Sequence, residues 1–227
     1  IALAIALVEL AIGVYAAVTV FDWSAPASYQ LYESRAWIPQ IGVTWSVAVT
    51  SLGLVMILLA LALVPLVLIA GWDEDEDRGA YPALVLALQA FMVLIFAAFD
   101  LAVFYFAFEA MLIPLYFMIG RYGVGDEAAR HKAAMKFLLY SLFGGLIMLG
   151  GVLFIWALGS STQSNTVAFF RMDTLAALLP NLSASVQMVV FVSFMVTFAI
   201  KAPMVPVHTW LPDTAAVARP GTSVLLV

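Results

Sequence analysis

The stretch VQMVVFVSFMVTFAIKAPMVPVHTWLPD, residues 186–213, decides the fold of this chain. It begins as an apolar run without charge, reaches Lys201, and continues through Pro203 and Pro206 to His208. An apolar helix of about 20 residues is about 30 Å long, which matches the hydrocarbon thickness of a bilayer. The stretch therefore predicts a membrane-spanning helix that its two prolines interrupt at residues 202–206.

The composition of the whole chain indicates the same class of protein. Of the 227 residues, 65% are hydrophobic and only 10% are charged, against about 25% charged in a typical soluble domain. Because the apolar runs are apolar on every face, we predict an all-α, polytopic helical bundle in a lipid bilayer rather than a β-barrel, whose strands alternate. The net charge of −5 gives no basis for binding nucleic acid.

The apolar runs predict a single, partial membrane domain. Asp100 is expected to cap the helix that follows it, and the segments 22–42 and 159–185 are predicted to be polar loops. Because the chain starts and stops inside apolar patterns and shows no signal peptide, we interpret it as an internal piece of a longer chain. The predicted spans cover about residues 1–21, 44–72, 82–99, 101–120, 136–158 and 186–213, with the start of a further span at 220–227.

The basic residues predict the orientation in the membrane. Lys and Arg near the ends of spans face the cytoplasm, whereas acidic residues count little. We therefore expect the side with more basic residues to be the cytoplasmic side. That side collects Arg78, Arg121, Arg130, Lys132 and Lys136, and the loops of the other side hold Arg35 and Arg171.

Three charged residues fall at membrane depth: Glu9, Glu109 and Lys201. A charge at this depth costs a few kcal/mol on insertion scales, so it needs a partner, water or a function. Glu9 lies near the start of the chain, and we interpret it as a satisfied or interface-facing carboxylate. Glu109 is the only charge in residues 101–120 and, like Lys201, lies close to the bilayer centre.

The Glu109 and Lys201 spans run in the same direction, so the two side chains are expected at similar depth. Two interpretations follow: a lysine whose protonation switches as the carboxylate moves, or a static ion pair that fixes helix packing. The prolines favour the switch, because they free carbonyls at about residues 199 and 202, which must face protein or water. His208 is either a proton relay or a structural hydrogen-bond donor.

The chain offers little for metals or redox groups. It has no Cys, which excludes disulfides, thiolate metal sites and cysteine-ligated iron–sulfur clusters, and its only histidines are His131 and His208. We predict no metal site and no cofactor bound by this chain itself.

Two glycines predict a close helix contact. Gly144 and Gly151 are seven residues apart and therefore lie on one face of their span. Small residues on one face let neighbouring membrane helices approach closely.

Four segments carry a family resemblance: FEAMLIPLYFMIGRYG (108–123), AAMKFLLYSLFGG (133–145), FAIKAPMVPVHTWLPD (198–213) and PGTSVLLV (220–227). They resemble the antiporter-like membrane subunits of proton-pumping NADH:quinone oxidoreductase, respiratory complex I, and are most similar to the M subunits, subunit 4 in mitochondria, of the actinobacterial type. The resemblance implies about fourteen helices in two inverted repeats. This chain would cover roughly the second to the eighth helix.

The resemblance also implies a function. In this family, the residues that match Glu109 and Lys201 form the pair that tunes a proton-carrying lysine. We therefore expect proton translocation coupled to quinone reduction by NADH, with FMN, iron–sulfur clusters and quinone on partner subunits and with paralogous antiporter-like subunits as neighbours.

Two alternatives remain open. The first is a subunit of a multi-subunit cation/proton antiporter or of a membrane-bound hydrogenase. The second is a structural membrane anchor in which the Glu109–Lys201 pair is static.

Overall fold

The computed structural model describes residues 1–25, 28–72, 79–162 and 168–226. Within these ranges, six helical segments are long and apolar enough to cross a membrane, which agrees with the six predicted spans in number and order. Their bounds are Ala2–Val20, Ser51–Ala70, Ala80–Ala97, Leu101–Gly120, Glu127–Gly159 and Ala184–Lys201.

In chain order, the elements are α1 (Ala2–Tyr15) with a π-helical turn (Ala16–Val20), β1 (Gln30–Ile38), β2 (Val43–Val49), α2 (Ser51–Ala70), α3 (Ala80–Ala97), α4 (Leu101–Ala110), α5 (Leu112–Gly120), α6 (Glu127–Thr162), α7 (Met172–Leu178), α8 (Ala184–Lys201), α9 (Trp210–Val217) and α10 (Pro220–Leu226).

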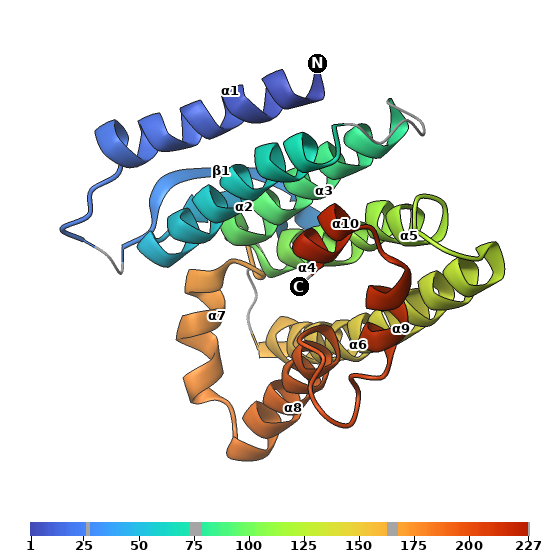
Figure 1. The fold of residues 1–227 in the computed structure, drawn as a ribbon. Coiled ribbons are helices and arrows are strands. Elements are labelled where there is room, and N and C mark those ends of the chain that lie inside the picture. Colours follow the sequence, from blue (N-terminus) through green and yellow to red (C-terminus); the bar gives the residue numbers. More distant parts are fainter. Residues whose placement is uncertain (26–27, 73–78, 163–167, 227) are drawn as a thin grey trace.

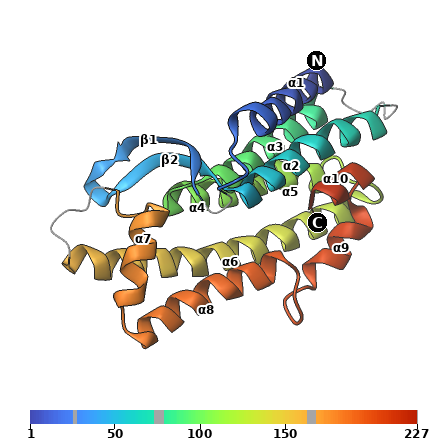
Figure 2. The ribbon, with the colours of Figure 1, turned by 90° about the vertical axis from the view of Figure 1, so that its left-hand side faces the viewer.

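The helices form a layered bundle (Figure 1, Figure 2). The α4–α5 segment packs between α3 on one side and α6 on the other, and α8 packs on α6. The middle of the bundle therefore holds α4, the helix that carries Glu109.

An antiparallel hairpin, β1–β2, corrects the first predicted loop and the second predicted span. The span starts at Ser51 rather than at residue 44, because residues 43–49 form strand β2. Their sequence, VTWSVAV, is rich in β-branched and aromatic residues, which favour strands. Thr50 then caps α2 by accepting a hydrogen bond from the Gly53 amide (3.2 Å).

The fifth span and the last loop also differ from their predictions. Helix α6 covers 36 residues, Glu127–Thr162, rather than 136–158. At about 1.5 Å per residue it is longer than the bilayer core, so its charged first turns extend the span outside the membrane. Those turns contain Ala, Glu, Arg and Lys, which are good helix formers. The segment predicted as the loop 159–185 includes helix α7.

The predicted break after Lys201 is confirmed. Helix α8 ends at Lys201, and α9 begins at Trp210. The prediction that the carbonyl of residue 199 is free is wrong, because the turn brings the Met204 amide back onto the Ala199 carbonyl (2.8 Å). The Trp210 indole instead donates to the carbonyl of Ile200 (2.8 Å), so this buried acceptor is satisfied by a side chain.

The predicted glycine contact is also confirmed. A Cβ atom at Gly144 would meet Ile200 and the backbone of Thr197, and one at Gly151 would overlap Ser193. The hydroxyl of Thr197 donates to the Gly144 carbonyl (2.7 Å). The absence of side chains at these glycines lets α6 and α8 pack closely.

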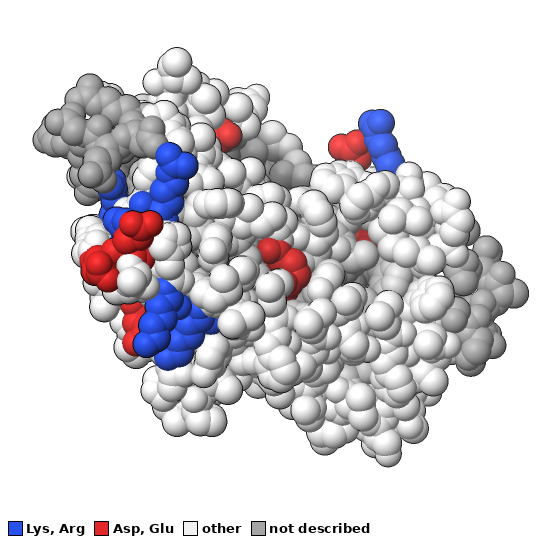
Figure 3. Space-filling model, turned by 90° about the vertical axis from the view of Figure 1, so that its right-hand side faces the viewer, with Lys and Arg blue, Asp and Glu red and all other residues white. Residues whose placement is uncertain are grey.

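On the face shown in Figure 3, most charged side chains gather at the edges, an acidic patch lies near the middle, and the lower right of the face is uncharged. At the end where α6 begins, Lys136 forms an ion pair with Asp213 of α9 (2.8 Å). The hydrogen bond from Lys136 and its charge lower the pKa of the Asp213 carboxyl from its ordinary value. Arg171 pairs with Asp173 beyond the opposite end of α6. Arg78, one of the predicted cytoplasmic residues, lies outside the described residues.

Candidate functional site

Glu109 lies at the end of α4, next to a second helix interruption. Helix α4 ends at Ala110, Met111 forms a turn, and α5 begins at Leu112. Pro114 accounts for the interruption, because proline has no N–H to donate to the carbonyl four residues earlier and clashes with it. The sequence analysis missed this break, although the proline in the EAMLIP segment was a signal for it.

The Glu109 carboxylate lies directly against helix α6. A Cβ atom built on Gly145 would overlap this carboxylate. The close contact therefore requires glycine at residue 145. Sequence reasoning missed the role of Gly145, because the neighbouring Gly144 faces the other way, towards Ile200 of α8.

The Lys201 ammonium lies between aromatic rings at the end of α8. Its Nζ is 5.0 Å from the ring centre of Phe108 and 5.7 Å from that of Phe137. Such contacts stabilise a cation by its attraction to the ring face. Since Phe108 immediately precedes Glu109, the two ionisable residues lie in the same layer of the bundle, as predicted.

The two charged groups are close but not paired. Among the residues that the structure describes, Glu109 and Lys201 form no ion pair. Glu109 Oε1 and Lys201 Nζ are both buried without a hydrogen-bond partner in the described chain. Buried polar atoms in proteins are nearly always bonded to protein or ordered water. These atoms are therefore available to water or to each other after a small movement.

His208 lies in the turn between α8 and α9, and its Nδ1 is likewise buried without a partner in the described chain. Thr209 and Trp210, which follow His208, fix this turn against helix α6. Thr209 shares a hydrogen bond with Tyr140 (2.7 Å), and the ring of Trp210 packs on Phe137 (5.3 Å between centres). Since Phe137 also contacts Lys201, the turn that carries His208 belongs to the same cluster of side chains.

Glu9 lies outside this cluster. Its Oε2 accepts a hydrogen bond from Gln89 of α3 (2.8 Å), while the residue itself is exposed on α1. The interpretation of Glu9 as a satisfied carboxylate is confirmed.

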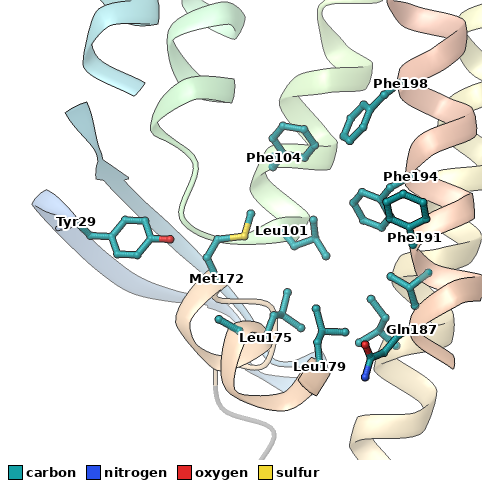
Figure 4. Close-up of a pocket in the computed structure, with 13 residues that line it drawn as sticks. Tyr29, Leu101, Phe104, Met172, Leu175, Leu179, Gln187, Phe191, Phe194 and Phe198 are labelled. Carbon is teal, nitrogen blue, oxygen red and sulfur yellow. The ribbon is translucent and has the colours of Figure 1, made fainter. Parts of the chain in front are cut away.

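A cavity of about 610 Å³ opens between α4, α7 and α8 (Figure 4). Its lining is almost entirely apolar, with Phe104, Phe191, Phe194 and Phe198 prominent. The ring of Phe198 also packs against the ring of Phe108, with 6.4 Å between the ring centres, so the cavity lies beside the Glu109–Lys201 cluster. Among the lining residues, Tyr29 and Gln187 carry polar groups, and we assign no chemistry to the cavity.

Comparisons with known proteins agree with this arrangement. The family described as "NADH:quinone oxidoreductase/Mrp antiporter, TM" matches residues 98–227, more than half of the chain. NADH-quinone oxidoreductase subunit M of Mycobacterium tuberculosis is 38% identical over 230 residues, covering 88% of this chain and 41% of the relative. The chain thus spans less than half the length of this relative.

Solved structures show the same fold. A chain of respiratory complex I from Thermus thermophilus with bound NADH has a TM-score of 0.80 and 28% identity over 99% of this chain and 44% of that chain. A chain of the Mrp complex from Dietzia sp. DQ12-45-1b has a TM-score of 0.78 over 99% of this chain and 23% of that chain; at 19% identity this likeness concerns the fold alone. The chain therefore belongs to the NADH:quinone oxidoreductase/Mrp antiporter family of transmembrane proteins.

Proposed function

We propose that this chain is part of a proton-translocating membrane subunit of NADH:quinone oxidoreductase in a bacterial cell membrane. The complex couples quinone reduction by NADH to proton pumping. FMN, iron–sulfur clusters and quinone belong to partner subunits, and other membrane subunits, including paralogous ones, lie beside this chain. Its own contribution is proton transfer within the bilayer. The names of the relatives support the complex, and the site supports the role of this chain.

One observation carries the proposal: an acid and an ammonium group lie in one buried layer without forming an ion pair. An opposite charge that approaches a buried amine stabilises its protonated form, and its retreat favours loss of the proton. Movement of the Glu109 carboxylate thus controls whether Lys201 holds a proton. His208, in the turn beyond Lys201, is the group that passes the proton on.

The two helix interruptions lower the free-energy cost of moving the Glu109 carboxylate relative to Lys201. One lies directly after Ala110 and the other directly after Lys201. Beyond Lys201 the backbone leaves the helix, and at Met111, which keeps helical dihedral angles, Pro114 removes one helical hydrogen bond, so a shift at either place breaks few such bonds. Broken helices beside ionisable groups at the membrane midplane are typical of transport sites.

A static anchor fits these observations less well. A buried ion pair offsets its desolvation cost only with close contact and full hydrogen bonding. Glu109 and Lys201 instead leave polar atoms unpaired within the described chain.

The proposal is tested by replacing Lys201 with Ala in the full-length chain within the assembled complex. Proton pumping linked to NADH oxidation should be lost while the complex still assembles. Lys132→Ala is the matched control, because Lys132 is exposed at the charged start of α6, and it should pump normally. Unchanged pumping in an assembled Lys201→Ala complex would contradict the role of this lysine. Purification without flavin and iron–sulfur subunits would instead indicate an independent antiporter.

A further inference from the structure

Ser141 is a fourth buried polar group of the site, and none of the steps above uses it. It lies in α6, is 4% exposed, and its Oγ has no hydrogen-bond partner in the described part of the chain. Ser193 of α8 shows the usual alternative: its hydroxyl donates to the Val190 carbonyl of its own helix (2.7 Å). The Ser141 hydroxyl is therefore left for a partner outside its helix.

The position of Ser141 on α6 points to that partner. Phe137, Ser141 and Gly145 are spaced four residues apart, so they lie above one another on one face of the helix. Phe137 contacts the Lys201 ammonium, and Gly145 contacts the Glu109 carboxylate. All three residues are buried. Ser141 thus occupies the middle of a face about 12 Å long whose two ends touch the two ionisable groups.

The chemistry of the three groups is complementary. A carboxylate only accepts hydrogen bonds and an ammonium only donates them, whereas a hydroxyl does both at once. A hydroxyl between the two can donate towards Glu109 and accept from the Lys201 side. A buried water needs two to four polar partners, and the unpaired atoms of Glu109, Ser141 and Lys201 supply three.

We propose that Ser141 is a positioning residue that holds a water-mediated hydrogen-bonded bridge between Glu109 and Lys201. This inference rests on the proposed function of the Glu109–Lys201 pair. The bridge keeps the Glu109 carboxylate in hydrogen-bonded contact with the protonated Lys201, and when the bridge opens the lysine proton passes on towards His208. Ser141 and the water reorient in this step, but neither gains nor loses a proton.

The test replaces Ser141 with Ala in the full-length chain within the assembled complex. The variant retains the helix, because Ala is the best helix former. Proton pumping per NADH oxidised should fall about threefold to tenfold, the effect of one lost hydrogen bond, and the pH profile of pumping should shift. Ser141→Thr keeps the hydroxyl, so it should retain both the normal pumping per NADH oxidised and the normal pH profile. Ser193→Ala is the matched control, since its hydroxyl is already bonded within α8, and it should pump normally.

The outcomes separate this inference from the function on which it rests. If Lys201→Ala abolishes pumping and Ser141→Ala pumps with the unaltered pH profile, the bridge is overturned and the pair stands. The bridge is also overturned if Ser193→Ala loses as much pumping as Ser141→Ala, because the effect then reflects packing. If Lys201→Ala pumps normally, the proposed function itself fails.

Discussion

Helix α4 has a buried aspartate at its start and a half-buried glutamate at its end, and the hydrogen bonding of the two carboxylates differs. Asp100, at the start of α4, is fully buried, and its oxygens accept hydrogen bonds from the Ala102 amide (2.9 Å) and from the amide and hydroxyl of Thr44 (2.9 and 2.8 Å). Glu109, at the end of α4, leaves Oε1 unpaired within the described chain. Burial alone therefore does not separate the two acids, whereas their hydrogen bonds do.

The direction of the helix explains the difference. The first turn of a helix presents free N–H groups and positive potential, whereas the last turn presents carbonyl oxygens and negative potential. The first turn of α4 thus supplies a donor to Asp100, and strand β2 supplies the others. The last turn offers Glu109 none. A carboxylate at that end must take its donors from other elements, and the candidates are Lys201, Ser141 and water.

The largest expected effect comes from removing the unsatisfied acid. Glu109→Gln keeps the size of the side chain but removes the charge that, in the proposed function, tunes Lys201. Pumping should fall by at least about tenfold, which corresponds to about 1.4 kcal/mol, while assembly is retained. The measurement is the pH change driven by NADH in sealed vesicles. A Glu109→Gln complex that pumps normally would show that the carboxylate has no part in transfer.

Removing the satisfied acid should affect stability instead. Asp100→Ala deletes the acceptor of three buried hydrogen bonds and leaves their donors unpaired, a loss of about 2–4 kcal/mol. Thermal denaturation of the complex should show the loss, and pumping per assembled complex should be retained. Thr44→Val, which removes one of the three donors, should cost less. A pumping defect in fully assembled Asp100→Ala would end the distinction between the two acids.

A smaller effect is expected from Gly145→Ala. The added methyl group would overlap the Glu109 carboxylate, so the carboxylate must move away from α6. Pumping should change by less than in Glu109→Gln, about threefold. Gly150→Ala, on the same helix, is a suitable control, because a Cβ atom added there would have nothing within 4 Å. Equal pumping in both variants would mean that the place of the carboxylate on α6 does not matter.

The smallest effect is expected at the exposed Lys136–Asp213 pair. The pKa of Asp213 is lowered in the folded chain by its hydrogen bond with Lys136. Its contribution to stability is therefore present above the ordinary pKa of an aspartate and is lost as the pH falls through the lowered value. Asp213→Asn should remove this part of the acid dependence and leave the melting temperature near neutral pH almost unchanged. A large drop in melting temperature at neutral pH would assign the pair a structural role that its exposure does not suggest.

Much of the site follows from the sequence because charge is rare in the spans. Glu109 and Lys201 stand out in apolar surroundings, the prolines predict the break after Lys201, and Asp100 caps α4 as expected. The hairpin was missed because residues 43–49 are as apolar as a span, and hydropathy does not separate a strand from a helix. Ser141 and Gly145 were missed because their roles arise from packing between helices distant in the chain.

The Trp210 side chain of α9 links this helix to the end of α8. Its indole N–H holds the carbonyl of Ile200, the residue before Lys201, while its ring rests on Phe137. Helix α9 is thereby fastened to the end of α8 through a buried bond rather than through the backbone alone. Any displacement of α9 must therefore either break that bond or move the end of α8 that carries Lys201.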